Sequence, residues 1–232
     1  MKLALAELPC LPGQLEANRA LHLTAIETAA EHGADLVCFP ELSLTGYAPR
    51  LAENLSMSKY DPFLAPFHEA CERLGIYAGV GVPWRGPELP WIMNFVFGPN
   101  AHLTIYGKEF LHNDEVPYFS PGAGGPILEI AGKRIALAIC YEISVEAHAA
   151  HAFAQDIDLY LASVAKTDSG MNASTVRMGN LAQQHQTYTA LVNSIGVSED
   201  FESAGRSGAW NPAGEAMQLE TAMDGQLKLM EF

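Results

Sequence analysis

The sequence predicts an α/β layered domain with a mixed sheet. Short apolar stretches, which are typical of strands, alternate along the chain with longer segments of helix-forming residues. Asp35–Phe39 is almost wholly hydrophobic, as expected for a strand that is buried on both faces. Two pairs of predicted strands are joined by the turn sequences Gly98–Ala101 and Gly132–Lys133, which indicates hairpins. Strands that alternate with helices, together with hairpins, are typical of a layered α/β domain.

The N-terminal half is predicted to contain two helices and five strands. One helix covers Asn18–Glu31 and ends at Gly33, and the second ends near Gly75. A glycine just after the last helical residue favours a helix end because it readily adopts the left-handed conformation. The predicted strands are Lys2–Leu8, Asp35–Phe39, Ile76–Val82, Ile92–Phe97 and His102–Tyr106.

The C-terminal half continues the alternation after a long loop. Lys108–Gly125 is polar and is interrupted by proline and glycine, which indicates a functional loop. Helices are predicted over Val145–Ala154 and Thr175–His185. The predicted strands are Leu128–Ile130, Arg134–Cys140, Leu159–Ser163 and Thr189–Ile195, with short strands around Gly208–Trp210, Met217–Leu219 and Leu227–Glu231. No repeat or linker divides the chain, so residues 1–232 are expected to form one domain.

The charge of the chain argues against several classes of partner. It has 27 Asp and Glu residues against 13 Lys and Arg, a formal net charge of −14, which repels nucleic acid and anionic membranes. Glu7 interrupts the N-terminal segment before a signal-peptide core forms, and no later apolar run spans a bilayer. The four cysteines include no Cys-x-x-Cys pair, so a zinc site has no support. We therefore expect a cytoplasmic protein with free thiols.

Three polar residues lie at the ends of predicted strands and suggest acyl-transfer chemistry. They are Glu41, Lys108 and Cys140. Open α/β sheets bind their ligands at the ends of strands, so the three side chains are expected to meet. A cysteine thiol with an ordinary pKa of about 8.5 is mostly protonated at pH 7 and needs a base. A carboxylate can accept its proton, and an ammonium can stabilise the thiolate and an oxyanion.

The segments around these residues resemble the signature segments of the carbon–nitrogen hydrolase (nitrilase) superfamily. The three segments are Phe39–Tyr47, Tyr106–Leu111 and Ile139–Glu142, and further matches are Asn94, Glu115, Asn193 and the stretch from Gly205 to Gly214. The matches occur in the family's order over nearly the whole chain. Ile143–Ala147 lacks the arginine and proline that many members carry after the cysteine, so the branch of the family is left open.

The resemblance implies a four-layer α-β-β-α sandwich with mixed sheets that forms a homodimer or a higher homo-oligomer and needs no cofactor. It also implies a catalytic triad of Glu41, Lys108 and Cys140. Glu115 matches a second family glutamate that positions Lys108 and the substrate, although the neighbouring Asp114 is an alternative. The backbone N–H of Tyr141 is expected to help bind the oxyanion. No metal is expected, because the spacing of His148 and His151 comes with no evident third ligand.

Six other residues are expected near the substrate. They are Tyr47, His112, Tyr118, Phe119, Ser163 and Lys166. Tyr47 and the two aromatic residues after Pro117 are candidates for lining the pocket. Ser163 and Lys166 follow a strand whose end should lie beside Cys140, and Lys166 either pairs with a substrate carboxylate or is solvated.

These observations predict a hydrolase that cleaves a non-peptide C–N bond of a small amide or carbamoyl compound through a thioester on Cys140. An amide is favoured over a nitrile because amide cleavage is the commoner activity of the superfamily. An acyltransferase that passes the acyl group to an amine is an alternative within the enzymes. A binding or regulatory protein that keeps the fold without turnover is an alternative of another class.

Overall fold

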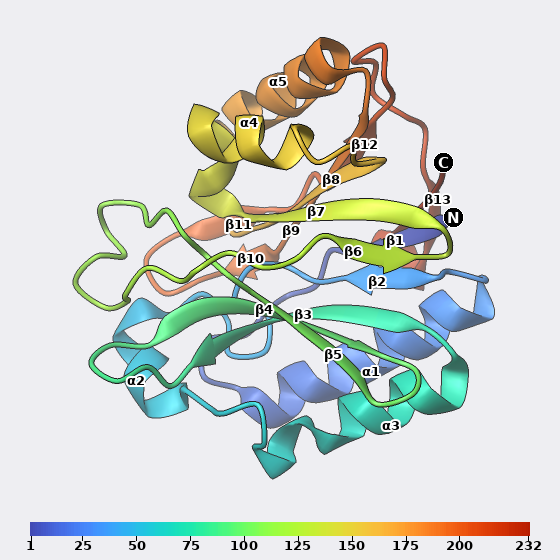
Figure 1. The fold of residues 1–232 in the computed structure, drawn as a ribbon. Helices are drawn as coiled ribbons and strands as arrows, with labels where there is room; N and C mark the ends of the chain where they lie inside the picture. The colour runs from blue at the N-terminus through green and yellow to red at the C-terminus, as the bar shows by residue number, and fades with distance from the viewer.

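The computed structural model describes residues 1–232 and shows a four-layer α-β-β-α sandwich (Figure 1). Two sheets face each other in the middle of the molecule. Helices α1 (Leu15–Glu31) and α3 (Ala65–Leu74) cover the outer face of one sheet, and α4 (Glu146–Phe153) and α5 (Asp168–His185) cover the other. The architecture expected from the family resemblance is therefore confirmed. No helix has both the length and the apolar character required to cross a membrane.

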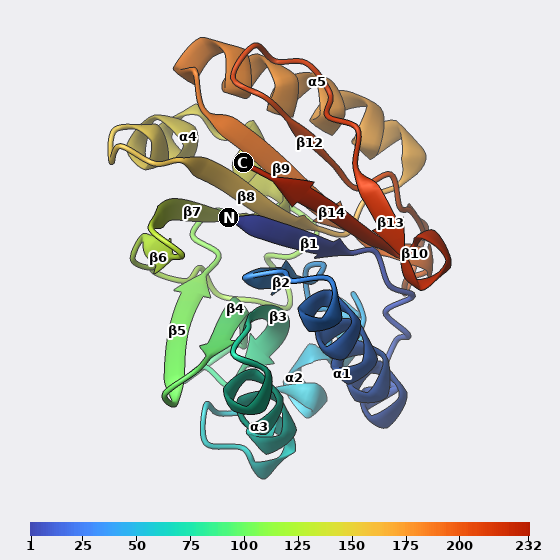
Figure 2. The same ribbon diagram turned by 90° about the vertical axis from the view of Figure 1, so that its right-hand side faces the viewer.

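The first sheet has seven strands in the order β13-β14-β1-β2-β3-β4-β5. Its strands are β1 (Lys2–Ala6), β2 (Leu36–Cys38), β3 (Tyr77–Trp84), β4 (Trp91–Gly98), β5 (His102–Gly107), β13 (Glu220–Ala222) and β14 (Leu227–Glu231). The pairs β1–β2 and β2–β3 are parallel, whereas the remaining pairs are antiparallel. Because β1 pairs with β14, the two termini lie side by side, and the Met1 ammonium donates to the carbonyl of Phe232 at 3.1 Å (Figure 2).

The second sheet has five strands in the order β12-β9-β8-β7-β6. Its strands are β6 (Leu128–Ile130), β7 (Lys133–Ile139), β8 (Leu159–Val164), β9 (Tyr188–Asn193) and β12 (Gly208–Trp210). The three central strands are parallel, and both edge strands are antiparallel to their neighbours. The remaining elements are a hairpin of β10 (Ile195–Val197) and β11 (Glu202–Ala204), the short helix α2 (Ala52–Leu55), and 3-10 turns at Pro49–Leu51, Pro62–Leu64, Cys140–Ser144 and Met223–Gly225.

Three layers of apolar side chains hold the sandwich together, one between each pair of neighbouring layers. Strand β8 shows how one sequence supplies two of them, because successive side chains of a strand point to opposite faces. Leu159 and Leu161 belong to the layer between the sheets. Tyr160 and Ala162 belong to the layer under α4 and α5. Both faces of this strand are buried, which explains its continuous apolar sequence.

Most predicted elements are present, with three differences in the C-terminal half. Helix α5 begins at Asp168 rather than Thr175, since the Thr167 hydroxyl accepts from the N–H of Gly170 at 3.3 Å and caps the earlier start. The strand expected at Met217–Leu219 is absent, and β13 forms over the residues that follow it. The backbone N–H of Met217 instead donates to the carbonyl of Ala209 at 2.8 Å. The β10–β11 hairpin was not predicted.

Candidate active site

The three predicted catalytic residues come from both sheets and meet between them. Glu41 follows β2 and Lys108 follows β5 in the seven-stranded sheet, whereas Cys140 follows β7 in the five-stranded sheet. The Lys108 ammonium lies 2.6 Å from Oε1 of Glu41 and 2.6 Å from Oε1 of Glu115. Cys140 lies close enough for the negative charge of Glu41 to act on its thiol. Residues that are distant in sequence therefore form one polar cluster, and Glu115 rather than Asp114 is the second acid that contacts Lys108.

Lys108 is a fully buried cation that lies between carboxylates. Its side chain is 0% exposed, and those of Glu41 and Glu115 are at most 1% exposed. Burial favours the neutral amine, but the negative charges of Glu41, Cys140 and Glu115 outweigh that effect and raise the pKa of Lys108. The lysine is therefore a permanent ammonium at neutral pH, held in place by two short charge-assisted hydrogen bonds.

Glu41 has one oxygen that is free to act as a base. Its Oε1 accepts from Lys108, whereas its Oε2 is buried and has no hydrogen-bond partner. Burial raises the pKa of Glu41 to about 7, because the nearby Lys108 ammonium only partly offsets the loss of solvation. A carboxylate with a pKa near the working pH can both accept and return a proton.

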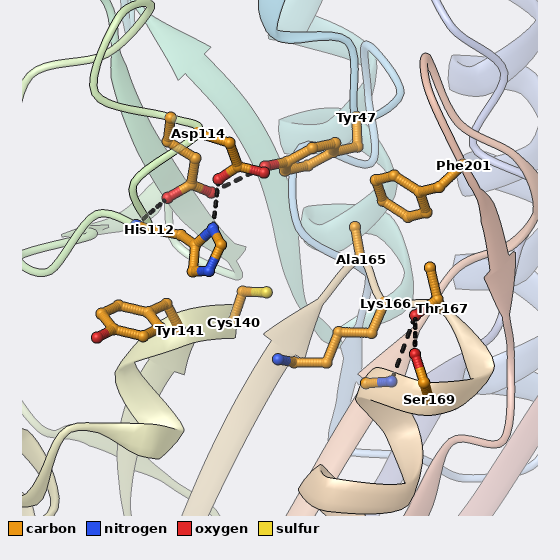
Figure 3. A pocket seen from close by; sticks show the side chains of 12 residues that line it. Tyr47, His112, Asp114, Cys140, Tyr141, Ala165, Lys166, Thr167, Ser169 and Phe201 are labelled. Carbon is orange, nitrogen blue, oxygen red and sulfur yellow. Dashed lines mark hydrogen bonds and ion pairs between the residues drawn. The ribbon is translucent and has the colours of Figure 1, made fainter.

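Cys140 is presented by a strained turn at the end of β7. Its φ angle of 49° lies in the left-handed region, which a residue with a side chain adopts at an energetic cost. It begins the 3-10 turn Cys140–Ser144, and its side chain points into the cavity (Figure 3). Burial and the negative charge of Glu41 raise the pKa of the thiol to about 12, although Lys166 and Lys108 act in the opposite direction. The resting thiol is therefore protonated and needs a base when it attacks.

Buried polar contacts fix the loop that carries Glu41. The hydroxyl of Ser43 accepts from the N–H of Gly81 at 3.1 Å and lies 2.8 Å from Nε2 of His22. Burial lowers the pKa of His22 to about 4, so the ring is neutral and can accept the Ser43 proton. A Cβ atom at Gly81 would lie 2.4 Å from the backbone nitrogen of Leu42, so only glycine allows strand β3 to approach this loop so closely. The roles of His22, Ser43 and Gly81 were not predicted, because no sequence motif links residues so far apart in the chain.

Glu142 connects the strand end that carries Lys108 to the strand end that carries Cys140. One of its oxygens accepts from the N–H of Glu109 at 2.6 Å, and the other accepts from the N–H of Ile139 at 2.7 Å. The hydroxyl of Tyr106 also donates to Glu142, at 2.9 Å, and lies 2.7 Å from Nε2 of His148. Its position two residues after the cysteine was the only sequence signal for this role.

The same cluster contains the one set of side chains that resembles a metal site. Ligand-type atoms of Glu109, Glu142 and His148 lie within 4.8 Å of one another. Both oxygens of Glu142 already accept hydrogen bonds, and the two ring nitrogens of His148 contact the hydroxyls of Tyr106 and Tyr160. Two of the three side chains, Glu142 and His148, are therefore already engaged in hydrogen bonds within the protein.

A cavity of about 360 Å³ opens over Cys140 (Figure 3). This volume suits a small molecule. The lining residues come from loops and turns that follow the strands and from the first turn of α5, and they are Tyr47, His112, Asp114, Glu115, Cys140, Tyr141, Ala165, Lys166, Thr167, Ser169, Gly170 and Phe201. The Tyr47 hydroxyl donates to Glu115 at 3.1 Å, and its ring packs 5.6 Å from that of Phe201. His112 and Asp114 form a hydrogen-bonded pair of 2.5 Å at the opening.

The substrate-side predictions divide into two groups. Tyr47, His112 and Lys166 line the cavity, as does Tyr141. Tyr118 instead lines an adjacent cavity of about 240 Å³, beside Pro117 and Asp200. Phe119 and Ser163 lie in the interior.

Phe119 and Ser163 do not reach the cavity because they face the interior between the sheets. Phe119 is 2% exposed and packs in the apolar layer there. Ser163 has the same parity in β8 as Leu161, which directs its hydroxyl into that layer. It accepts from Asn94 at 3.1 Å and lies 3.3 Å from the sulfur of Cys38. The expectation that these two residues contact substrate is thus not met by their positions.

Comparison with known proteins agrees with the fold. The carbon-nitrogen hydrolase family matches residues 2–222, and the chain belongs to this family. An amidase structure from Nesterenkonia sp. AN1, with acrylamide added at its active-site cysteine, superposes with a TM-score of 0.90. It shares 23% sequence identity and covers 100% of this chain and 93% of that chain, which supports the fold.

Curated relatives include both hydrolases and larger enzymes. The chain is 25% identical to an (R)-stereoselective amidase from Pseudomonas sp, in an alignment that covers 94% of this chain and 80% of that protein. It is 26% identical to the glutamine-dependent NAD(+) synthetase of Aquifex aeolicus, in an alignment that covers 97% of this chain. That match spans only 41% of the synthetase. These relatives support hydrolysis of amide C–N bonds as the general activity.

Proposed function

We propose that this protein hydrolyses a small primary amide through a thioester on Cys140. The observation that carries the proposal is the contact of the buried Lys108 ammonium with Glu41, whose second carboxylate oxygen has no partner, beside the Cys140 thiol that lines the cavity. These groups are a base, an electrostatic stabiliser and a nucleophile. A binding protein would not require a buried, unpartnered carboxylate oxygen beside a thiol.

The first half of the reaction forms the acyl-enzyme. Glu41 Oε2 accepts the thiol proton while the sulfur of Cys140 bonds to the amide carbon. The Lys108 ammonium stabilises the oxyanion of the tetrahedral intermediate by its positive charge. The Tyr141 N–H is available as a second donor, because the first N–H groups of a helical turn have no intrahelical acceptor. Glu41 then gives its proton to the amide nitrogen. The C–N bond breaks, ammonia leaves, and a thioester remains on Cys140.

The second half releases the acid. Glu41, again a carboxylate, accepts a proton from a water molecule that attacks the thioester carbon. The same donors stabilise the second oxyanion. The C–S bond breaks as Glu41 returns its proton to the sulfur, which restores the thiol and leaves the carboxylic acid product.

Ammonia release from primary amides, followed across about pH 5 to 9, tests this function. Glu41 must be deprotonated to act as the base, and burial raises its pKa to about 7. We expect kcat/KM to rise about tenfold per pH unit up to about pH 7 and then to level off. Matched nitriles should release ammonia more slowly than the amides.

Two results would contradict the proposal. One is an absence of ammonia release from every amide in the series. The other is an acid limb near the ordinary glutamate pKa of about 4.3, which would exclude the buried Glu41 as the base. The homodimer and the cytoplasmic location expected from the sequence stay predictions.

A further inference from the structure

Lys166 is the only lysine or arginine that lines the cavity over Cys140. The two acids that line the same cavity are already engaged. Asp114 bonds to the ring of His112, and Glu115 bonds to Lys108 and Tyr47. The Lys166 ammonium, by contrast, has no carboxylate within 4.0 Å and no hydrogen-bond acceptor, although the protein as a whole carries a formal charge of −14.

The backbone of Lys166 is fixed more firmly than that of an ordinary loop residue. Its N–H donates to the side-chain oxygen of Asn193 at 2.9 Å, and its carbonyl accepts from the Asn193 amide at 3.0 Å. The carbonyl also accepts from the N–H of Ala204 at 3.0 Å. Asn193 is 0% exposed, so its two hydrogen bonds with the Lys166 backbone are protected from solvent. The point from which the side chain extends is thus set by β9 and β11.

The side chain lies along the cavity wall and approaches the nucleophile. Figure 3 shows it extending from the end of β8 toward the part of the cavity into which Cys140 points. A Cβ atom built at Gly170 would lie 3.4 Å from Cβ and 3.7 Å from Cγ of Lys166, so the first turn of α5 packs along the lysine stem. The positive charge of Lys166 also acts on the Cys140 thiol. The backbone hydrogen bonds of Lys166 and the packing of its side chain against α5 together direct the ammonium into the cavity.

Lys166 is half-buried, and its ammonium has no partner in the protein. A substrate carboxylate would supply one through a charge-assisted hydrogen bond. The opposite wall is unsuited to that carboxylate, because the acidic Asp114 lies there beside His112. The lining also includes the apolar residues Ala165 and Phe201.

We propose that Lys166 binds a carboxylate on the acyl part of the substrate, so that the preferred substrates are monoamides of short dicarboxylic acids. This inference rests on the proposed amide hydrolysis. The amide carbon would lie at Cys140 and the carboxylate at the Lys166 ammonium, with the methylene chain in the cavity between them.

The test compares kcat/KM for glutaramate with that for valeramide, a neutral amide with the same number of carbon atoms. We expect the wild-type protein to prefer glutaramate, and Lys166→Met to lower the ratio of the two kcat/KM values by about 30-fold, as the loss of a hydrogen bond between charged groups predicts. Lys166→Arg should keep most of the preference because it keeps the charge. Lys59→Met, which removes a lysine outside the cavity, should leave the ratio unchanged.

The ratio of the two kcat/KM values distinguishes recognition of the substrate carboxylate from a general effect on the Cys140 nucleophile. If Lys166 acts only by stabilising the Cys140 thiolate, Lys166→Met will lower kcat/KM for both amides by the same factor, and the inference is overturned. A wild-type protein that hydrolyses valeramide as well as glutaramate also overturns it, while the proposed amide hydrolysis stands. Absence of ammonia release from both amides overturns the proposed function and this inference with it.

Discussion

Replacement of Cys140 by alanine is expected to lower kcat for amide hydrolysis by roughly a million-fold, as removal of a catalytic nucleophile does in other hydrolases. The sulfur forms the covalent bond in the proposed mechanism, and no other cysteine lines the cavity. The fold should survive, because alanine occupies less space than cysteine and the side chain lies at the edge of a cavity. The measurement is single-turnover and steady-state ammonia release, with thermal unfolding as the check on structure.

Cys71→Ala is the matched control for loss of a thiol. Cys71 is fully buried in the apolar layer under α1 and α3, away from the cavity. Its removal should lower the unfolding temperature slightly and leave kcat near the wild-type value. If Cys140→Ala retained more than about a hundredth of wild-type kcat, far above the residual rate of a protein without its nucleophile, Cys140 would not be the nucleophile.

The second large effect concerns both stability and turnover. Lys108→Met leaves Glu41 and Glu115 buried next to each other without the ammonium that both contact. Removal of one partner from a buried ion cluster typically destabilises a protein by about 3–5 kcal/mol. Loss of the oxyanion stabiliser should also lower kcat by at least about 100- to 1000-fold. Chemical denaturation measures the first effect and ammonia release the second.

The stability loss in Lys108→Met should depend on pH in a defined direction. Without the ammonium, the pKa of at least one glutamate in the folded protein rises further above its unfolded value of about 4.3. The folded state then binds more protons than the unfolded state above pH 4.3 or so, so its stability falls as pH rises. We expect a larger loss at pH 8 than at pH 5 or thereabouts.

Lys133→Met provides the matched control for this pH dependence. Lys133 pairs with Asp158 at 3.2 Å, and about a third of each side chain is exposed, at 33% and 36%. An exposed pair of this kind contributes about 0–1 kcal/mol. An equal loss of stability in Lys108→Met and Lys133→Met would show that the buried cluster is not charged as we describe it.

The fold was largely predictable because local patterns and tertiary packing agree along most of the chain. Gly75 follows the last residue of α3 with a φ angle of 68°, the conformation its position predicted. Helix α5 shows where the pattern was insufficient. Its first turn contains Ser169 and Gly170, which disfavour helix, and the Thr167 cap decides its start. The β10–β11 hairpin is short and partly polar, so no periodic signal marks it.

The candidate site was predictable to the extent that strand ends position it. Glu41, Lys108 and Cys140 all follow strands, and the topology brings them together. Partners that are distant in sequence were not predictable, since the contact between His22 and Ser43 joins helix α1 to the loop after β2. Ser163 shows a different limit. Its side in β8 depends on register, and a shift of one residue would have turned it toward the helices.

The most direct test of the account is the mass of the Cys140 peptide during turnover. Wild-type protein is mixed with a primary amide, quenched in acid within the first turnovers, digested and analysed by mass spectrometry. We predict an added mass equal to the amide minus ammonia on the peptide that contains Cys140, and no such mass in Cys140→Ala. An acyl group on any other residue, or continued ammonia release after Cys140 has been alkylated, would contradict the account.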